Sequence, residues 1–358
     1  MKAWRLERLG GALRLEDIGV PKARAGGVVV KVETSSLMSY MKDYADGKLP
    51  IYHAPDGAFT PGGNGVGVVH EVGPGVWHLV PGQRVVLSSH VVAQENVPEP
   101  AQILLGITAA GPVAERLQSY WRDGTLAEFA EWPASAVTLA EELPGIDATQ
   151  LAMAMRFVVP YGGLLRGRLA AGETLVVSGA TGAYGAASVF LALAMGAARV
   201  VALGRRREAL EPLLAKAGGR VVPVVTTGDV AADVAAIRAA AGRAPQMAFD
   251  MVGGARDPNS TLAALRSLGR EGRIVLMGSM GVDLPVPYVE LMMNAWEIIG
   301  NFMYPRDAFA RLFDLVRAGH LKLDAIEPRT YPLAELPAAM DAAAAASSLE
   351  CVVMRHPQ

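Results

Sequence analysis

A glycine-rich segment in the middle of the chain, LVVSGATGAYG from Leu175 to Gly185, has the composition of a phosphate-binding turn. It follows a short apolar run and opens an alanine-rich stretch, so we expect a strand, a tight turn and a helix. The first backbone N–H groups of such a helix have no partner within the helix, and Gly182 has no Cβ to obstruct a pyrophosphate. Ala180 departs from the usual GxGxxG spacing, but the strand-turn-helix context predicts a dinucleotide-binding turn. A glycine turn without a ligand is the alternative.

The residues expected to follow the pyrophosphate lie in this turn and at the start of the helix. They are Gly179, Thr181, Gly182, Ala183 and Tyr184. The third glycine, Gly185, is expected to let the helix pack close to the strand.

Three consecutive arginines predict which dinucleotide binds. The next apolar run, RVVALG, ends at Gly204 and is followed by Arg205, Arg206 and Arg207. A cofactor with a free ribose 2′-hydroxyl favours a carboxylate at this point, whereas guanidinium groups bind a 2′-phosphate through paired, charge-assisted hydrogen bonds. The sequence therefore favours NADPH over NADH, with Gly204, Arg205 and Arg206 at the phosphate. A solvated basic start of a helix is the alternative.

Two parts of the chain with different sequence patterns are expected to form the elements that position these residues. From Met1 to about Pro144 the chain has short valine-rich pieces bounded by glycine or proline, which predict the strands of an irregular barrel or sandwich. These pieces include residues 28–33, 65–72 and 83–89, and residues 97–124 interrupt them with an inserted loop that holds a short helix.

From about Ile146, nearly continuous apolar runs alternate with alanine-rich helical segments, which predicts a parallel sheet covered on both faces. The runs are residues 175–179, 199–204, 220–225, 247–254 and 273–278. Two helices, at 308–319 and 336–347, and a final strand at 351–355 are expected to close the chain.

Composition limits the partners. The 33 basic residues nearly balance the 35 acidic ones, so no overall field attracts nucleic acid or an anionic membrane, and a small-molecule substrate is expected. The single cysteine, Cys351, excludes an internal disulfide and fits a reducing compartment. The N-terminal segment lacks the apolar core of a signal peptide, and no run has membrane-spanning character, so a cytoplasmic location is expected.

Several motifs in combination resemble the medium-chain dehydrogenase/reductase superfamily over nearly the whole chain. They are TPGGNGVGVVHEVGPGV, VPGQRV, GTLAEFA, ETLVVSGATGAYG, FDMVGG and GREGRIVLMG. The resemblance implies an α/β protein with a GroES-like, β-rich catalytic domain at 1–145 and a Rossmann, doubly wound NADP(H)-binding domain at 146–300. It further implies that residues 301–358 return to the catalytic domain and that the protein is a homodimer.

The resemblance also bears on whether His70 and Glu71, in TPGGNGVGVVHEVG, belong to a metal site. Zinc alcohol dehydrogenases of this superfamily carry His-Glu where this chain has Gly63 and Asn64, and a cysteine ligand near Met38. Residues 97–124 replace their four-cysteine lobe. A tetrahedral zinc needs at least three thiolate, imidazole or carboxylate ligands. No metal is therefore expected, and His70 and Glu71 are interpreted as strand residues past the ligand position.

The resemblance supplies the nicotinamide side and candidates for the substrate side. The nicotinamide side is expected to involve Asp250 to Gly253, including Val252, together with Met277, Gly278, Ser279, Asn301 and Phe302. Tyr40, Lys42 and Asn64 are the candidate catalytic residues, with Tyr52 nearby. The segment MSYMKDY is similar to the DPYMR text of prostaglandin-reductase-type enone reductases, although Met38 replaces its aspartate. Tyr40 could donate a hydrogen bond to a carbonyl oxygen, and an ordinary core or rim tyrosine is the alternative.

The predicted function is an NADPH-dependent, zinc-independent reductase that transfers hydride to a quinone or an α,β-unsaturated carbonyl. Such electron-poor acceptors need no Lewis acid, whereas a simple alcohol does. Two alternatives are a metal-free NADP(H)-dependent alcohol dehydrogenase or ketone reductase, and a non-catalytic NADPH-binding protein.

Overall fold

The computed structural model describes residues 1–140, 143 and 145–357, and the chain divides into two compact units. The first unit comprises Met1–Met155, Glu327–Ala346 and Glu350–Gln358. The second comprises Arg156–Ile326 and Ser347–Leu349. The first boundary thus falls after Met155, later than position 145, and Pro144 itself lies outside the described residues.

The first unit is built on one seven-stranded sheet. In spatial order its strands are β10 (Val137–Leu139), β5 (Arg84–Leu87), β4 (Gly65–Val72), β3 (Gly27–Ser36), β18 (Glu350–Arg355) and β17 (Glu327–Pro332), with β9 (Phe129–Pro133) also paired to β3. β17 and β18 run parallel, and the other pairs are antiparallel. The register between β3 and β4 shifts twice, after Val29 and after Val32, as at β-bulges that bend a strand.

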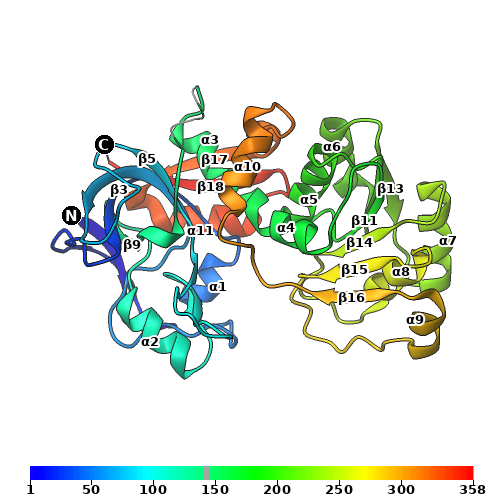
Figure 1. Cartoon of the computed structure of the whole chain (residues 1–358), viewed down its shortest axis with the longest axis horizontal. Helices are drawn as coiled ribbons and strands as arrows, with labels where there is room; N and C mark the ends of the chain where they lie inside the picture. Colours follow the sequence, from blue (N-terminus) through cyan, green and yellow to red (C-terminus); the bar gives the residue numbers. More distant parts are fainter. Residues whose placement is uncertain (141–142, 144, 358) are drawn as a thin grey trace. The chain divides into compact units, whose positions relative to one another are not determined.

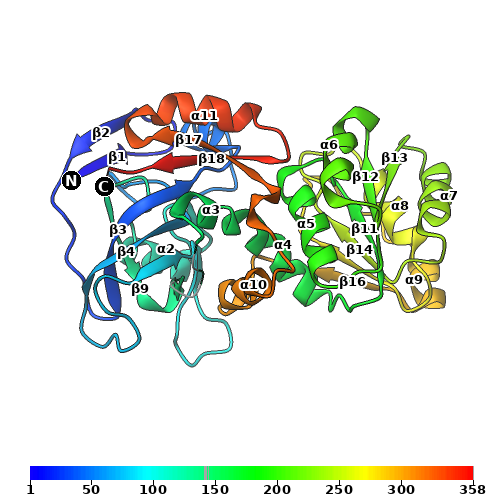
Figure 2. The ribbon, with the colours of Figure 1, turned by 90° about the horizontal axis from the view of Figure 1, so that it is seen from above.

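Smaller elements surround this sheet. They are β1 (Lys2–Leu6) with β2 (Leu13–Asp17), β6 (His90–Val92) with β7 (Gln102–Leu104) and β8 (Thr108–Ala109), and the helices α1 (Met41–Ala45), α2 (Pro112–Tyr120), α3 (Ala148–Ala152) and α11 (Leu336–Ala345). α11 lies along β17 and β18 (Figure 2). The valines of β3 are buried with Trp132, whereas Phe59 and Tyr44 are buried beside α1 and α11.

The second unit has a six-stranded parallel sheet in the order β13-β12-β11-β14-β15-β16, seen edge to edge in Figure 1. Its strands are β11 (Thr174–Ser178), β12 (Arg199–Gly204), β13 (Val221–Val225), β14 (Met247–Asp250), β15 (Arg273–Leu276) and β16 (Glu297–Gly300). From β11 the chain adds strands first toward one edge of the sheet, as β12 and β13, and then toward the other edge, as β14, β15 and β16. This is the strand order of a Rossmann sheet, whose ligand binds where the order changes, between β11 and β14. The predicted α/β class with a doubly wound parallel sheet is confirmed.

Helices cover both faces of that sheet. In chain order, the helices of this part of the chain are α4 (Ala154–Arg166), α5 (Ala183–Ala194), α6 (Arg207–Ala217), α7 (Val230–Ala241), α8 (Asn259–Ser267), α9 (Tyr288–Asn294) and α10 (Ala308–Arg317). α5 and α6 pack together on one face, and α7 and α8 on the other (Figure 2). The four inner strands are almost fully buried, as their continuous apolar runs predict, whereas the edge strands β13 and β16 are partly exposed.

Residues 301–326, expected to begin the segment that returns to the first domain, lie in the second unit. The reason is local packing. Phe309 of α10 meets Tyr304 edge-on with ring centroids 5.7 Å apart, and Tyr304 in turn lies against the helix position of Gly162 in α4. The return to the first unit begins with β17 at Glu327. Over the described residues, no helix combines the length and apolar character needed to cross a membrane.

Candidate active site

The glycine turn after β11 is tightly packed against the helix that follows it. β11 ends at Ser178, Gly179 adopts φ +78°, and α5 begins at Ala183 with Gly182 as its N-cap. The Gly182 N–H donates to the Gly179 carbonyl at 2.9 Å. A Cβ on Gly185 would overlap the Gly179 carbonyl oxygen. Gly185 therefore allows the helix to sit directly on the turn, as the sequence predicts.

The N-terminus of α5 faces solvent. Gly182 is exposed and Thr181, Ala183 and Tyr184 are half-exposed. The first-turn N–H groups of a helix carry a partial positive charge and bind phosphate oxygens well. A 12-residue helix with a bare glycine cap at this position is suited to a pyrophosphate.

A second positive group at this turn was missed by the sequence analysis. The Arg156 guanidinium lies over the Tyr184 ring, with its Cζ 5.6 Å from the ring centroid, and Arg156 is only 6% exposed. Arg156 stands at the start of α4, a separate element from the glycine motif. The tertiary fold alone brings it beside Tyr184, and its only sequence signal is a charged residue inside an apolar run.

The end of β12 adjoins the same turn. The Ala180 N–H donates to the Leu203 carbonyl at 3.1 Å, and a Cβ on Gly204 would lie 2.8 Å from the Thr181 methyl carbon. Arg205 and Arg206 follow directly, and both are exposed. The structure thus places the predicted pyrophosphate turn and the predicted 2′-phosphate residues side by side.

The next loop, after β13, is held by a carboxylate in the first turn of α7. Asp233 is 1% exposed and accepts hydrogen bonds from the Thr227 N–H at 2.8 Å, the Thr227 hydroxyl at 2.9 Å and the Gly228 N–H at 3.1 Å. The loop itself is tied to β12 through the Thr226 N–H and the Gly204 carbonyl. The buried Asp233 carboxylate therefore fixes the conformation of this loop through its hydrogen bonds to Thr227 and Gly228.

The residues predicted for the nicotinamide side also gather at strand ends. Asp250, the last residue of β14, accepts from the Val252 N–H at 2.8 Å and from the Thr261 hydroxyl. Burial raises the pKa of Asp250, and these two hydrogen bonds oppose that rise. A Cβ on Gly278 would overlap the Val252 backbone, so the loops after β14 and β15 touch. The two loops thus form one continuous surface at the strand ends, made of Val252, Gly253 and Gly278 and called the ledge below.

Asn301 joins this ledge from β16. Its Nδ2 donates to the Met303 carbonyl at 2.8 Å and lies 3.3 Å from the Met277 sulfur. The backbone of Ser279 has φ +59°, a value that residues other than glycine rarely adopt. Phe302 is 60% exposed. Every predicted cofactor residue therefore lies at the carboxyl ends of the parallel strands, where ligands of such sheets bind.

The substrate-side candidates lie in the first unit. Tyr40 is half-buried at the N-cap of α1, and its ring centroid is 5.8 Å from that of Tyr52. Tyr52 packs edge-on against Tyr44, whose hydroxyl donates to the Ile107 carbonyl at 2.7 Å. Burial raises the pKa of Tyr44 well above its ordinary value. Tyr40 is the tyrosine of this cluster that the sequence singles out as a proton donor.

Lys42 and Asn64 have other partners in the structure. The Lys42 ammonium is exposed and ion-paired with Asp341 of α11, and this hydrogen bond raises the pKa of Lys42. The Asn64 Oδ1 accepts from the Ser89 N–H at 2.7 Å, which ties the loop before β4 to the chain after β5. Both side chains therefore have a structural function that the sequence analysis did not predict.

The residues at the expected zinc position do not fit a zinc ion. A Cβ on Gly63 would lie 2.7 Å from the Ile107 Cδ1, so the space of a ligand side chain is filled by a core residue. Met38 and Asn64 supply no thiolate, imidazole or carboxylate. Over residues 1–140, 143 and 145–357, no three His, Cys, Asp or Glu side chains lie together as a metal site requires. His70 is exposed and packs edge-on against Phe129, with ring centroids 5.0 Å apart.

Comparison with known proteins agrees with this architecture. Residues 24–142 match the family described as "Alcohol dehydrogenase GroES-like domain", and residues 183–318 match the family described as "Zinc-binding dehydrogenase". An alcohol dehydrogenase of Moraxella sp. (strain TAE123) is 27% identical over 330 residues, covering 90% of each chain. An NAD-dependent alcohol dehydrogenase of Sulfurisphaera tokodaii is 25% identical over 338 residues, covering 90% of this chain and 91% of that one.

A solved structure extends the comparison to the whole fold. The 2R,3R-butanediol dehydrogenase of Bacillus subtilis superposes with a TM-score of 0.80 at 21% identity, covering 100% of this chain and 99% of that chain. At this identity the likeness concerns the fold alone. The two matched families fall one in each unit of the structure.

Proposed function

The chain belongs to the medium-chain dehydrogenase/reductase superfamily, and on this premise we propose that it is an NADP(H)-dependent oxidoreductase that transfers hydride without zinc. The observation that carries the cofactor proposal is the position of Arg205 and Arg206. They follow β12 beside the glycine turn, where a 2′-phosphate would lie, and Asp233 in the first turn of α7 already accepts from three donors of the adjoining loop.

The second unit would hold this cofactor along one edge of its sheet. The N–H groups of the first turn of α5 would bind the pyrophosphate, with Arg156 adding positive charge, and the ledge of Val252, Gly253 and Gly278 would support the nicotinamide. Bound NADPH supplies the hydride. The protein's own contribution is to bind, orient and keep water from the reacting atoms.

We propose an electron-poor acceptor, either a quinone or an α,β-unsaturated carbonyl. The support is the poor fit of zinc at Gly63, Met38 and Asn64, because polarising a simple alcohol or ketone is the task for which a metal is useful. Tyr40 is the proposed proton donor, acting on the carbonyl oxygen as negative charge develops there. Lys42 is assigned to the ion pair with Asp341, and Asn64 to its loop.

A metal-free alcohol dehydrogenase or ketone reductase is the second candidate. It is favoured by the relatives, which are named as alcohol dehydrogenases and match 90% of this chain. In this case Tyr40 would polarise the substrate oxygen in place of a metal.

The test is an acceptor screen on the purified protein, with zinc content measured on the same sample. We expect NADPH oxidation with an enone or a quinone, unchanged after treatment with 1,10-phenanthroline. Turnover of ketones alone would select the second candidate. Stoichiometric zinc whose removal abolishes turnover would refute the zinc-free mechanism, and tight NADPH binding without turnover of any acceptor would make the chain a binding protein.

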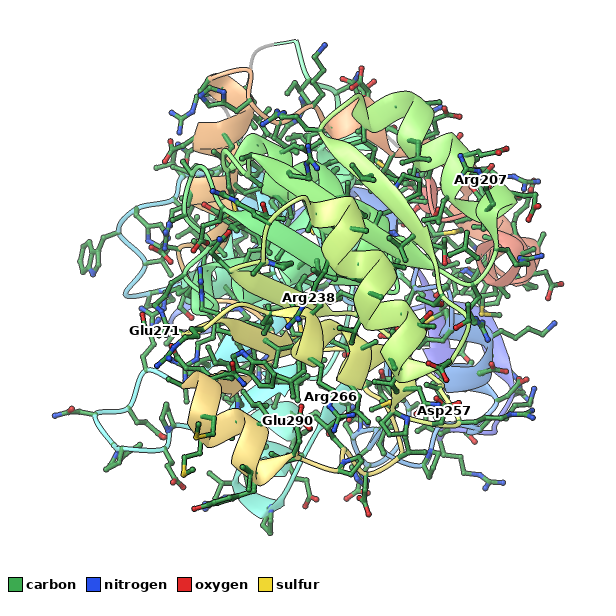
Figure 3. All side chains as sticks on the ribbon, turned by 90° about the vertical axis from the view of Figure 1, so that its right-hand side faces the viewer. Arg207, Arg238, Asp257, Arg266, Glu271 and Glu290 are labelled. Atoms are coloured by element: carbon green, nitrogen blue, oxygen red, sulfur yellow. The ribbon has the colours of Figure 1, made fainter. Side chains whose placement is uncertain are left out.

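We also propose that the protein is a cytoplasmic homodimer. α9 has no buried residue, and Tyr288, Val289, Met292 and Met293 are each at least 60% exposed. Figure 3 shows this helix with Glu290 beside Arg266, to which it is ion-paired at 2.7 Å. β16, next to α9 in sequence, pairs with β15 and forms one edge of the sheet. Open strand edges and exposed apolar patches favour association with a second copy. Met292→Glu is expected to convert the dimer to a monomer in light scattering.

A further inference from the structure

The first unit contains a cavity of about 290 Å³ that none of the candidate catalytic residues lines. Three segments form most of its wall. They are the chain after β2 (residues 18–24), the end of α2 with the residues after it (119–124), and β9 with the residues before it (127–131). Its volume is close to the lower limit of about 300 Å³ for ligand pockets, so it suits a small molecule.

One charged pair fixes a wall of this cavity. Glu131 accepts from the Arg24 backbone N–H at 2.9 Å and from the Arg24 Nε at 2.8 Å, and lies 2.7 Å from its Nη2. The Arg24 guanidinium also stacks over the Tyr120 and Trp121 rings, with its Cζ 4.2 and 4.8 Å from their centroids. Arg24 and Glu131 thus neutralise each other in a rigid arrangement.

A second pair compensates the other acidic residue of the wall. Asp123 lies 2.6 Å from the Arg5 Nη1 and accepts from the Thr60 N–H at 2.6 Å. The Arg5 side chain is only 15% exposed and also donates to the Ala58 carbonyl. Asp123 therefore has its countercharge within the protein.

Two positive groups of the wall have no ion-paired carboxylate among the residues that the structure describes. One is the N-terminal ammonium of Met1, which donates to the Ile18 carbonyl at 2.8 Å, and the other is the Arg122 guanidinium. Its Nη2 donates to the Asp56 carbonyl, while its Nε is buried and, over the same residues, has no hydrogen-bond acceptor. A buried guanidinium N–H without an acceptor is unfavourable, since a charged donor loses water without replacement. The wall thus has two positive groups without an ion-paired carboxylate and, within the described part of the chain, one guanidinium N–H group without an acceptor.

We propose that this cavity is a second binding site, which takes a small organic carboxylate with a compact apolar body. The carboxylate would pair with the Arg122 guanidinium, and a small shift of this half-buried side chain would also give its Nε an acceptor. The apolar body would lie against the half-buried side chains of Ile18, Pro21 and Phe129. Because the wall joins the 97–124 insertion to the sheet, a bound ligand would also tie these two parts together. The proposal is independent of the hydride-transfer function.

The experiment compares benzoate with benzamide, its neutral isostere, by calorimetric titration of the full chain in the presence of saturating NADPH. We expect saturable benzoate binding, with benzamide at least tenfold weaker. Arg122→Gln is expected to weaken benzoate by at least tenfold, whereas Arg116→Gln, an exposed arginine of α2, leaves it unchanged. Equal binding of the two probes, or benzoate affinity retained in Arg122→Gln, would overturn the proposal.

A structural measurement covers the case in which Arg122→Gln does not fold. NADPH binding and the thermal midpoint of the variant report whether it is native. A crystal of the wild-type protein soaked in benzoate then decides. We expect the carboxylate within hydrogen-bonding distance of the Arg122 guanidinium, and an empty cavity at saturating benzoate would refute the site.

Discussion

Replacement of Arg205 and Arg206 by glutamine tests the cofactor assignment most directly. Both side chains are exposed, immediately after β12, and the neighbouring turn residue Thr181 contacts the preceding Gly204. NADPH and NADH differ only in the 2′-phosphate. The variants should therefore lose affinity for NADPH alone, while NADH, which shares the pyrophosphate and nicotinamide contacts, binds as before.

The expected magnitude follows from the hydrogen bonds that are lost. A hydrogen bond to a charged group contributes about 1.5–3 kcal/mol, and about 1.4 kcal/mol is a factor of ten in affinity. Because solvent and salt screen exposed charges, we expect the lower end, about tenfold for each arginine and about 100-fold for the double variant. The loss should shrink at high salt, since screening also weakens the wild-type interaction.

The assay is fluorescence titration of both cofactors into the wild-type protein, the single variants and the double variant, at two salt concentrations. Arg207→Gln is the matched control. Arg207 is the next residue, it begins α6, and its guanidinium lies 3.9 Å from the Glu211 carboxylate (Figure 3). An unchanged ratio of NADPH to NADH affinity in the double variant would refute the assignment, as would an equal loss for both cofactors.

Three further predictions concern the turn, stability at low pH and the proton donor. Gly185→Ala should weaken NADPH binding at least tenfold and lower the free energy of unfolding by about 1–3 kcal/mol, because the added methyl group overlaps the Gly179 carbonyl oxygen of the turn. Wild-type affinity for NADPH in a titration of this variant would contradict the prediction. Burial raises the pKa of Glu173, but the hydrogen bonds from Arg273 and the Ala170 N–H, together with the positive charges of Arg273 and Arg168, outweigh burial and leave the pKa below its ordinary value. The ion pair therefore stabilises the fold at pH values above the unfolded-state pKa of Glu173, and this stabilisation is lost as the pH falls through the folded-state pKa. In urea unfolding, Glu173→Ala should lower the free energy of unfolding by about 3 kcal/mol at pH 7 and by clearly less at pH 3.5. A loss that does not depend on pH would contradict this sign. Tyr40→Phe should lower kcat for enones about 100-fold without changing the Kd of NADPH, whereas Tyr52→Phe should leave kcat nearly unchanged, and equal effects of the two would remove Tyr40 as the donor.

Several features of the fold were predictable because they depend on neighbours in sequence. The strand at Gly65–Val72 was predicted to the residue, and the strands at the start and end of the βαβ unit to within one residue. Continuous apolar runs are typical of strands buried on both faces, and the alternation with alanine-rich helices predicts a parallel sheet. The missed strands are those without such a pattern. β17, EPRTYP, is mostly exposed and polar, and it is held by pairing to β18.

The site divides in the same way. The sequence by itself determined the glycine turn, the arginines after β12 and the lack of ligand residue types at the expected zinc position, because each depends on residue type at a short, local spacing. Only the tertiary structure decided that Lys42 is paired with Asp341, that Arg156 lies over Tyr184 and that, among the residues described, the Arg122 Nε has no acceptor. The partners of a side chain come from segments far apart in the chain, so the packing of the whole unit determines them, and no local pattern encodes it.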